Sequence, residues 1–258
     1  MRPALLILVL PAILLIPASQ ISASSSAQPG VWKIVALGDS DATGEGDASG
    51  LGWVGRYARL LRQKLGLKVE VTSLAVNGQT SDNLLADVRS DPTTRAALKE
   101  AHIILIGSGG ADLGPGDERL EAGQCKGVAC YRALLAKFSR NLDAAAAGIR
   151  KMRTGKDAVL RAITLPNVVP GARDVTPPFI TDAIGVYQTK TLKRAICGVM
   201  TTHAGRCVDA LLAFNGPSAS ANAYTKGLLT KNPCCYPSGK GQQLMAELVF
   251  KSGLKPLR

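Results

Sequence analysis

The stretch that decides the fold is residues 31–40, which read Val-Trp-Lys-Ile-Val-Ala-Leu-Gly-Asp-Ser. Residues 31–37 form an apolar run of strand length, and the Gly-Asp-Ser that follows is suited to a turn. A run with a single charged residue predicts a strand that is buried on both faces. A buried strand that ends in a polar loop is typical of an open parallel sheet.

The same pattern recurs along the chain, because short apolar runs alternate with longer segments of helical periodicity. This alternation predicts a parallel sheet covered by helices on both faces. The expected fold class is therefore α/β, with three α/β/α layers around a five-stranded, parallel, flavodoxin-like sheet. The predicted strands are residues 31–37, 68–75, 102–106, 158–165 and 206–212, and the predicted helices are residues 52–65, 81–88, 130–152, 181–202 and 238–251.

Composition narrows the class of protein. Hydrophobic residues make up 46% of the 258 residues, which excludes a disordered chain. Aromatic residues make up only 4%, too few for a base-stacking surface, so we expect no nucleic-acid partner. The formal net charge of +12 comes from scattered basic residues. These basic residues either keep the protein surface solvated or attract the anionic polymers or lipid headgroups of a cell envelope.

The N-terminus has the pattern of a signal peptide. Arg2 precedes an apolar run, residues 4–16, and a Ser/Ala-rich stretch follows it. A helix of that length rises about 20 Å, whereas a bilayer core is about 30 Å thick, so we expect no permanent membrane span. Residues 1–27 are therefore predicted to be a signal peptide, cleaved near Ser24 or Gln28. Residues 28–258 are predicted to form a single domain that is secreted or extracytoplasmic.

Export would place the six cysteines in an oxidising space, which favours disulfides. Two pairs of cysteines bracket short loops. The chain has no Cys-x-x-Cys pair, and its two histidines stand apart, so we expect neither a metal nor a cofactor. The predicted disulfides are Cys125–Cys130 and Cys197–Cys207, while the pairing of Cys234 and Cys235 stays open.

Ligands of such a sheet bind beyond the carboxyl ends of the strands, where Ser40 is placed as a candidate nucleophile. The spacing of Asp39, Asp41 and Thr43 also mimics the nucleophile motif of Mg²⁺-dependent phosphatases and the start of an EF-hand loop. The chain lacks the late acidic pair of those phosphatases. Gly50 stands where an EF-hand needs a carboxylate. The expected functional loops are residues 38–51, 76–80, 107–128, 166–180 and 213–237.

Four short blocks in these loops resemble, in order, those of the SGNH/GDSL hydrolase superfamily. They are Gly-Asp-Ser at 38–40, Gly78, Gly-Gly-Ala-Asp at 109–112, and Pro-Cys-Cys-Tyr-Pro at 233–237. The resemblance spans about residues 31–253. It implies the SGNH hydrolase fold and hydrolysis of carboxylic esters. With the signal-peptide pattern and the basic charge, the expected protein is an exported hydrolase whose substrate is a small ester or an envelope polymer.

The resemblance also implies a mechanism, from which this chain departs. In the family, a histidine activates the serine, an aspartate orients the histidine, and an asparagine side chain joins two backbone N–H groups in holding the oxyanion. Ser40, as nucleophile, and Gly78, as an oxyanion N–H donor, are retained. Ala111 stands at the asparagine position, Tyr236 at the histidine position and Pro233 at the aspartate position.

No other residue is an evident substitute for the missing base. Tyr236 would have a pKa near 10, and His102 and His203 are expected at the opposite end of the sheet. Loss of a triad base lowers kcat roughly 10⁶-fold in serine proteases. The sequence therefore predicts a weak or inactive hydrolase. The alternative is a non-catalytic protein of this fold that binds an envelope ligand or partner.

Overall fold

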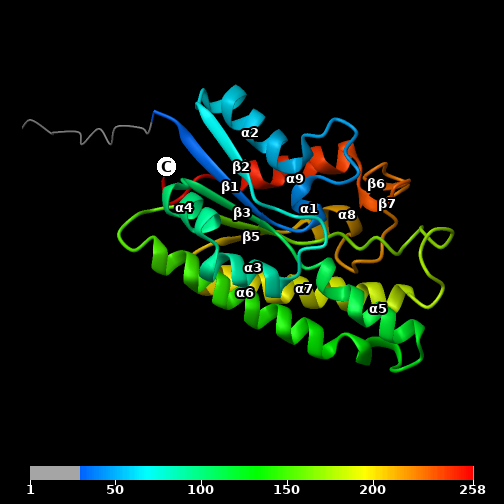
Figure 1. The fold of residues 1–258 in the computed structure, drawn as a ribbon. Coiled ribbons are helices and arrows are strands. Elements are labelled where there is room, and N and C mark those ends of the chain that lie inside the picture. Colours follow the sequence, from blue (N-terminus) through cyan, green and yellow to red (C-terminus); the bar gives the residue numbers. More distant parts are fainter. Residues whose placement is uncertain (1–29, 258) are drawn as a thin grey trace, which may run out of the picture.

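A five-stranded parallel sheet forms the centre of the computed structural model, which describes residues 30–257 (Figure 1). The strand order is β2-β1-β3-β4-β5, which confirms the predicted fold class. The predicted signal segment, residues 1–27, lies outside the described residues. The strands are β1 (Trp32–Gly38), β2 (Val69–Ser73), β3 (Ile103–Gly107), β4 (Val159–Ile163) and β5 (Arg206–Val208).

Helices cover both faces of the sheet because its central strands are apolar on both sides (Figure 1). In β1, Val35 and Leu37 pack with one layer, and Ile34 and Ala36 pack with the other. One layer contains α2 (Gly52–Leu65), α8 (Ala210–Asn215) and α9 (Gly239–Lys251). The other contains α3 (Ser81–Ser90), α4 (Pro92–Glu100), α6 (Arg132–Met152) and α7 (Asp182–Thr202).

Two glycines let β1 and β3 end side by side. Gly38 pairs with Gly107 in the parallel register. Gly38 has φ +126°, and a Cβ added there would lie 1.8 Å from Gly107 O. A side chain at position 38 is therefore excluded by both conformation and space. The next residue, Asp39, donates its backbone N–H to Gly107 O over 2.9 Å, which directs the following helix across the end of β3.

The fifth predicted strand is too long. It ends at Val208, and residues 210–215 form α8 instead. Asp209 caps this helix, because its Oδ1 accepts a hydrogen bond from Leu212 N at 3.0 Å. An apolar run of this length fits a buried strand and a buried helix equally well. The cap at Asp209 favours the helix.

Several short elements are absent from the sequence prediction. They include α4 and a two-stranded antiparallel hairpin that follows α8. The hairpin presents the final sequence block at the carboxyl end of the sheet. The remaining elements are α1 (Ser40–Thr43), α5 (Gly114–Glu121), β6 (Leu229–Lys231), β7 (Cys234–Pro237) and the 3₁₀ turns η1 (Ala111–Leu113) and η2 (Gly127–Cys130).

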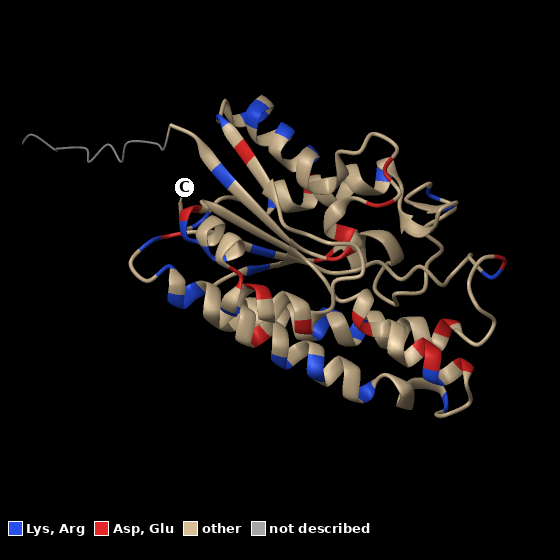
Figure 2. Cartoon of the chain, viewed as in Figure 1, with Lys and Arg blue, Asp and Glu red and all other residues tan. Residues whose placement is uncertain are grey.

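The disulfides agree with the predicted pairs. Cys125–Cys130 closes the loop after α5, and Cys197–Cys207 ties α7 to β5. The adjacent Cys234 and Cys235, which the sequence left open, are bonded to each other. Figure 2 shows Lys and Arg scattered over the outer helices. Within residues 30–257, no helix has both the length and the apolarity to cross a bilayer.

Candidate active site

Asp39 organises the carboxyl end of the sheet. It is fully buried, and its Oδ2 accepts hydrogen bonds from the backbone N–H groups of Gly109 (3.0 Å), Gly110 (2.9 Å) and Ala111 (3.3 Å). Its Oδ1 caps α1 by accepting from Asp41 N at 3.1 Å. Burial raises the pKa of Asp39, and these amides oppose that rise. One carboxyl thus ties the Ser40 turn to the loop after β3.

Ser40 opens α1 and lines a cavity of about 290 Å³. Asp41, Cys235 and Tyr236 line the same cavity, which brings the first and last sequence blocks together. In the described part of the chain, the Ser40 hydroxyl makes no hydrogen bond to another residue. The other lining residues are Gly110, Leu113, Asp117, Leu165, Pro166, Asn167, Val168, Val169, Thr176, Pro177, Ile180, Gln188, Thr189 and Leu192.

Two ionisable groups of the cavity are shifted toward their neutral forms. Burial and, secondarily, the charge of Asp39 raise the pKa of Asp41 to about 8. Burial is also the main cause that raises the pKa of Tyr236, followed by the charges of Glu45, Asp41 and Asp39. At neutral pH, neither side chain is therefore predominantly in the ionised form that could accept a proton from Ser40.

Both histidines lie away from this cavity, as the sequence predicts. His102 immediately precedes β3 at its amino end, and its Nδ1 accepts from Lys33 N at 3.0 Å. His203 caps the end of α7, and its Nε2 is 2.8 Å from Asp143 Oδ1. The chain has no further histidine that could serve as a base.

The remaining candidate residues, Gly78, Ala111 and Pro233, are not among the described residues that line the cavity. Gly78 is exposed in the turn after β2, where its φ of +77° favours glycine. This turn is held to the Ser40 helix, because Asn77 Oδ1 accepts from Thr43 Oγ1 at 2.6 Å. Ala111 begins η1 and offers a methyl group in place of an amide. Pro233 lies between β6 and β7, immediately before the paired cysteines.

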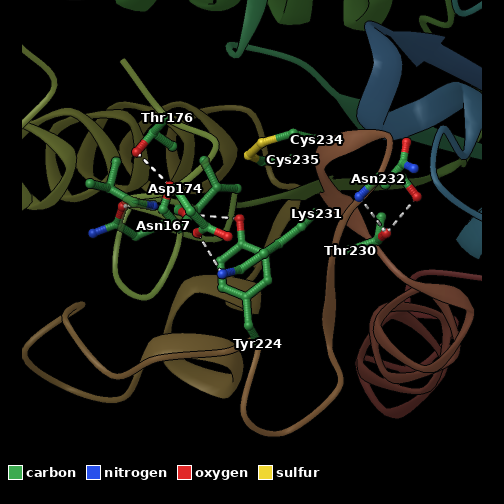
Figure 3. The surroundings of a disulfide bond; sticks show 12 residues. Asn167, Asp174, Thr176, Tyr224, Thr230, Lys231, Asn232, Cys234 and Cys235 are labelled. Carbon is green, nitrogen blue, oxygen red and sulfur yellow. Dashed lines mark hydrogen bonds and ion pairs between the residues drawn. A yellow bond between two sulfur atoms is a disulfide. The ribbon is translucent and has the colours of Figure 1, made fainter. Parts of the chain in front are cut away.

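The β6–β7 hairpin contacts the loops on either side of it. Lys231 Nζ contacts Asp174 Oδ1 at 2.6 Å, which joins the hairpin to the loop after β4 (Figure 3). Thr230 Oγ1 donates to Asn232 O at 3.0 Å. On the other side, a Cβ added to Gly46 would lie 2.6 Å from Tyr236 Cβ, so the loop after α1 packs directly on the hairpin. These contacts hold Tyr236 at the mouth of the site.

Sequence reasoning missed Asp117 and Gln188. Asp117 lies in the first turn of α5, and its Oδ1 accepts a hydrogen bond from Tyr131 Oη at 2.5 Å. Burial raises the pKa of Asp117, while Tyr131 and Gln188 oppose the rise. Gln188 comes from the middle of α7. No local signal marks these residues, because α5 and α7 are far apart in sequence and only the fold joins them.

Comparisons with known proteins give the family and the fold of the chain. Residues 36–244 match the model of the GDSL-like lipase/acylhydrolase family. YpmR of Bacillus subtilis (strain 168), named only as an uncharacterized protein, is 38% identical over 81 residues. That match covers 31% of this chain and 31% of YpmR, so the chain spans about a third of that relative's length.

Solved structures show the same fold. The lipase Lip_vut3 from a goat rumen metagenome superposes with a TM-score of 0.73 at 22% identity, covering 88% of this chain and 100% of that chain. A lipase/acylhydrolase from Enterococcus faecalis has a TM-score of 0.55 at 20% identity, covering 86% and 94%. A catalytic variant of Axe2, an acetylxylan esterase from Geobacillus stearothermophilus, has a TM-score of 0.56 at 16% identity, covering 85% and 93%.

The family match covers the segment that carries Ser40. The matched region begins inside β1, two residues before Gly38, and ends inside α9. It therefore includes the sheet, the loops at its carboxyl end and the hairpin that carries Tyr236. The chain belongs to the GDSL-like lipase/acylhydrolase family.

Proposed function

We propose that this protein is an exported hydrolase of small carboxylic esters with low turnover, in which Ser40 is the nucleophile. The observation that carries the proposal is the position of Ser40. Its hydroxyl lies at the carboxyl end of the sheet, on a mainly apolar cavity, and is not engaged by any other described residue. A hydroxyl held at such a site can meet an ester carbonyl.

The proposed reaction is acyl transfer in two steps. Ser40 Oγ attacks the ester carbonyl and displaces the alcohol, and water then hydrolyses the acyl-serine to a carboxylic acid and free Ser40. The N–H groups of Ser40 and Gly78 are proposed to hold the oxyanion. Ala111 provides no third donor, because it lacks a side-chain amide.

Low turnover follows from the fate of the serine proton. With Tyr236 and Pro233 at the family's histidine and aspartate positions, the proton passes to water instead of to an imidazole. Asp41 is a poor substitute because a pKa of about 8 leaves its carboxyl mainly protonated at neutral pH. The alternative function is ligand binding without turnover. It is favoured by the retention of a formed cavity around Ser40 where the family's base is missing.

The first test is hydrolysis of aryl acetates and butyrates by the wild-type protein and by Ser40→Ala. We expect a wild-type rate only slightly above that of the variant, and slow labelling of Ser40 by a fluorophosphonate. Absence of any Ser40-dependent rate or labelling would favour the binding function. A turnover of about 1–10³ s⁻¹ that is lost in Ser40→Ala would show that a base is present after all.

Export is tested separately by N-terminal sequencing of the protein recovered outside the cytoplasm of an expressing bacterium. We expect a mature N-terminus near Ser24 or Gln28, because small residues precede both positions. Recovery only inside the cell, with Met1 retained, would contradict export and leave the proposed chemistry untouched.

A further inference from the structure

We propose that the Ser40 cavity selects ligands that carry a positive charge on an apolar body and discriminates against anionic ones. This inference rests on the proposed function, because it takes the cavity to be the ligand site. It assigns to that site a substrate class, namely esters with a cationic group such as an ammonium.

The ionisable side chains of the cavity are acidic, whereas those of the chain are mainly basic. The protein has 31 Lys and Arg against 19 Asp and Glu. Yet the described residues that line the cavity include two carboxyl groups, Asp41 and Asp117, and no Lys or Arg. An anionic polymer attracted to the outer surface would therefore find no cationic partner at Ser40. The scattered surface charge does not predict the ligand of the site.

The two carboxyls come from different elements and are set in a mainly apolar lining. Asp41 is in α1 beside Ser40, and Asp117 is in α5. Leu113, Leu165 and Leu192 are among the aliphatic side chains between and around them. A volume of about 290 Å³ is near the lower end of ligand pockets, so the apolar part of the ligand is small.

Among residues 30–257, neither carboxyl has a cationic neighbour. Asp41 faces the carboxyl of Asp39 in its own turn and Tyr236 from β7. Asp117 accepts from Tyr131 and Gln188, both neutral, and Glu118 adds a like charge. A bound cation would favour the ionised form of both carboxyls. A bound anion would disfavour ionisation of the two carboxyls and would find no cationic side chain among the described lining residues.

The test compares three ligands with one alkyl chain: octyltrimethylammonium, 1-octanol and octanoate. Binding is measured by calorimetry on the wild-type protein, because none of the three ligands is an ester that Ser40 could hydrolyse. We expect octyltrimethylammonium to bind at least about tenfold more tightly than octanoate at pH 8. The net positive charge of the protein acts in the opposite direction, so non-specific attraction cannot produce this order.

Variants then locate the preference. Asp41→Asn and Asp117→Asn should each lower the affinity for octyltrimethylammonium about tenfold and leave the affinity for 1-octanol unchanged. Asp143→Asn is the matched control, because Asp143 pairs with His203 outside the cavity. This substitution should change the affinity for neither ligand. Binding of the ammonium should also strengthen as pH rises toward 8, and this dependence should disappear in Asp41→Asn.

The outcomes separate the two proposals. Binding of octanoate as tight as that of the ammonium, or equal losses in Asp143→Asn, would overturn the inference. Binding of 1-octanol without any charge preference would overturn it and leave the proposed function intact. Failure of all three ligands to bind would remove the cavity as a ligand site, and the proposed function with it.

Discussion

Asp39 and Asp41 show how two identical side chains in one turn take different roles. Asp39 accepts four backbone N–H groups, so its burial is compensated by hydrogen bonds. Asp41 has no such partners, and burial beside Asp39 raises its pKa to about 8. The first carboxyl holds the loops that place Ser40. The second is a destabilising group that the fold tolerates at the cavity wall.

Asp41→Asn should stabilise the protein in a pH-dependent way. The pKa of Asp41 rises from an unfolded value of 3.8 to about 8. The folded protein therefore holds a proton that the unfolded chain loses, and stability falls as pH rises through this range. We expect little change in Tm near pH 4 and a gain of several °C near pH 9, which corresponds to about 1 kcal/mol or more.

The measurement is thermal unfolding across pH, with Asp143→Asn as the control. Asp143 is paired with His203 on the surface and should not reproduce the effect. A Tm difference that stays constant from pH 4 to pH 9 would mean that Asp41 titrates normally in the folded protein.

At the scale of elements, the β6–β7 hairpin and α9 determine what lies opposite Ser40. Gln242 of α9 is fully buried. Its Oε1 accepts from Trp53 N at 2.9 Å, and its Nε2 donates to Glu45 O at 3.2 Å. The amide thus connects α9 to α2 and to the loop after α1. Position 236 is therefore held near Ser40 by scaffold contacts that do not depend on a histidine.

Restoring the family's residues should therefore create activity. In the triple variant Ala111→Asn, Pro233→Asp, Tyr236→His, the amide restores an oxyanion donor and the imidazole accepts the Ser40 proton. We expect aryl-ester turnover at least about 10²-fold above wild type, since general-base catalysis alone is worth about 10²–10⁴. Single changes should do little, because a triad acts as a unit.

The control is Ser40→Ala in the triple-variant background, which should abolish the gain. The Cys234–Cys235 bond immediately precedes position 236, so a parallel variant also carries Cys234→Ala and Cys235→Ala. A well-folded triple variant with no Ser40-dependent gain, with or without that bond, would show that position 236 does not correspond to the family's histidine.

Across the whole molecule, Arg161 joins the central sheet to the end of the chain. It is 2% exposed in the middle of β4. Its Nε donates to Ser252 Oγ at 2.7 Å, and its Nη2 donates to Gly253 O at 2.7 Å and Lys255 O at 3.2 Å. Burial lowers the pKa of Arg161 to about 10, which leaves it charged at neutral pH. The guanidinium thus satisfies carbonyl groups that follow α9.

Arg161→Leu should lower the free energy of unfolding by about 3 kcal/mol, because the partly buried carbonyl groups after α9 lose a charged donor. Urea denaturation measures this loss. Arg206→Gln is the comparison. The side chain of Arg206 is exposed and, within residues 30–257, donates one hydrogen bond, to Ser252 O at 3.2 Å, so the substitution should cost less than about 1 kcal/mol. Equal effects of the two substitutions would show that Arg161 does not anchor the C-terminal segment.

Much of the scaffold followed from local patterns. Apolar runs at β1, β3 and β4 predicted buried strands, and the Gly-Asp-Ser after β1 placed Ser40 at the carboxyl end of the sheet. One further element, α4, had a readable signal: Asp91 precedes Pro92, and its Oδ2 accepts from Thr94 N at 2.6 Å. Such features are local because a cap or a buried strand depends on neighbouring residues.

The composition of the site was decided only by the tertiary structure. Asp117 and Gln188 are 71 positions apart and share one cavity with Ser40 because parallel crossovers bring α5 and α7 to the same edge of the sheet. The raised pKa of Asp41 also has a tertiary cause, since burial depends on what packs above the turn. The sequence by itself determined that Ser40 follows the first strand, and that alanine, proline and tyrosine stand at positions 111, 233 and 236. The charge and shape of the cavity around Ser40 depend on contacts between distant segments, which a local pattern does not encode.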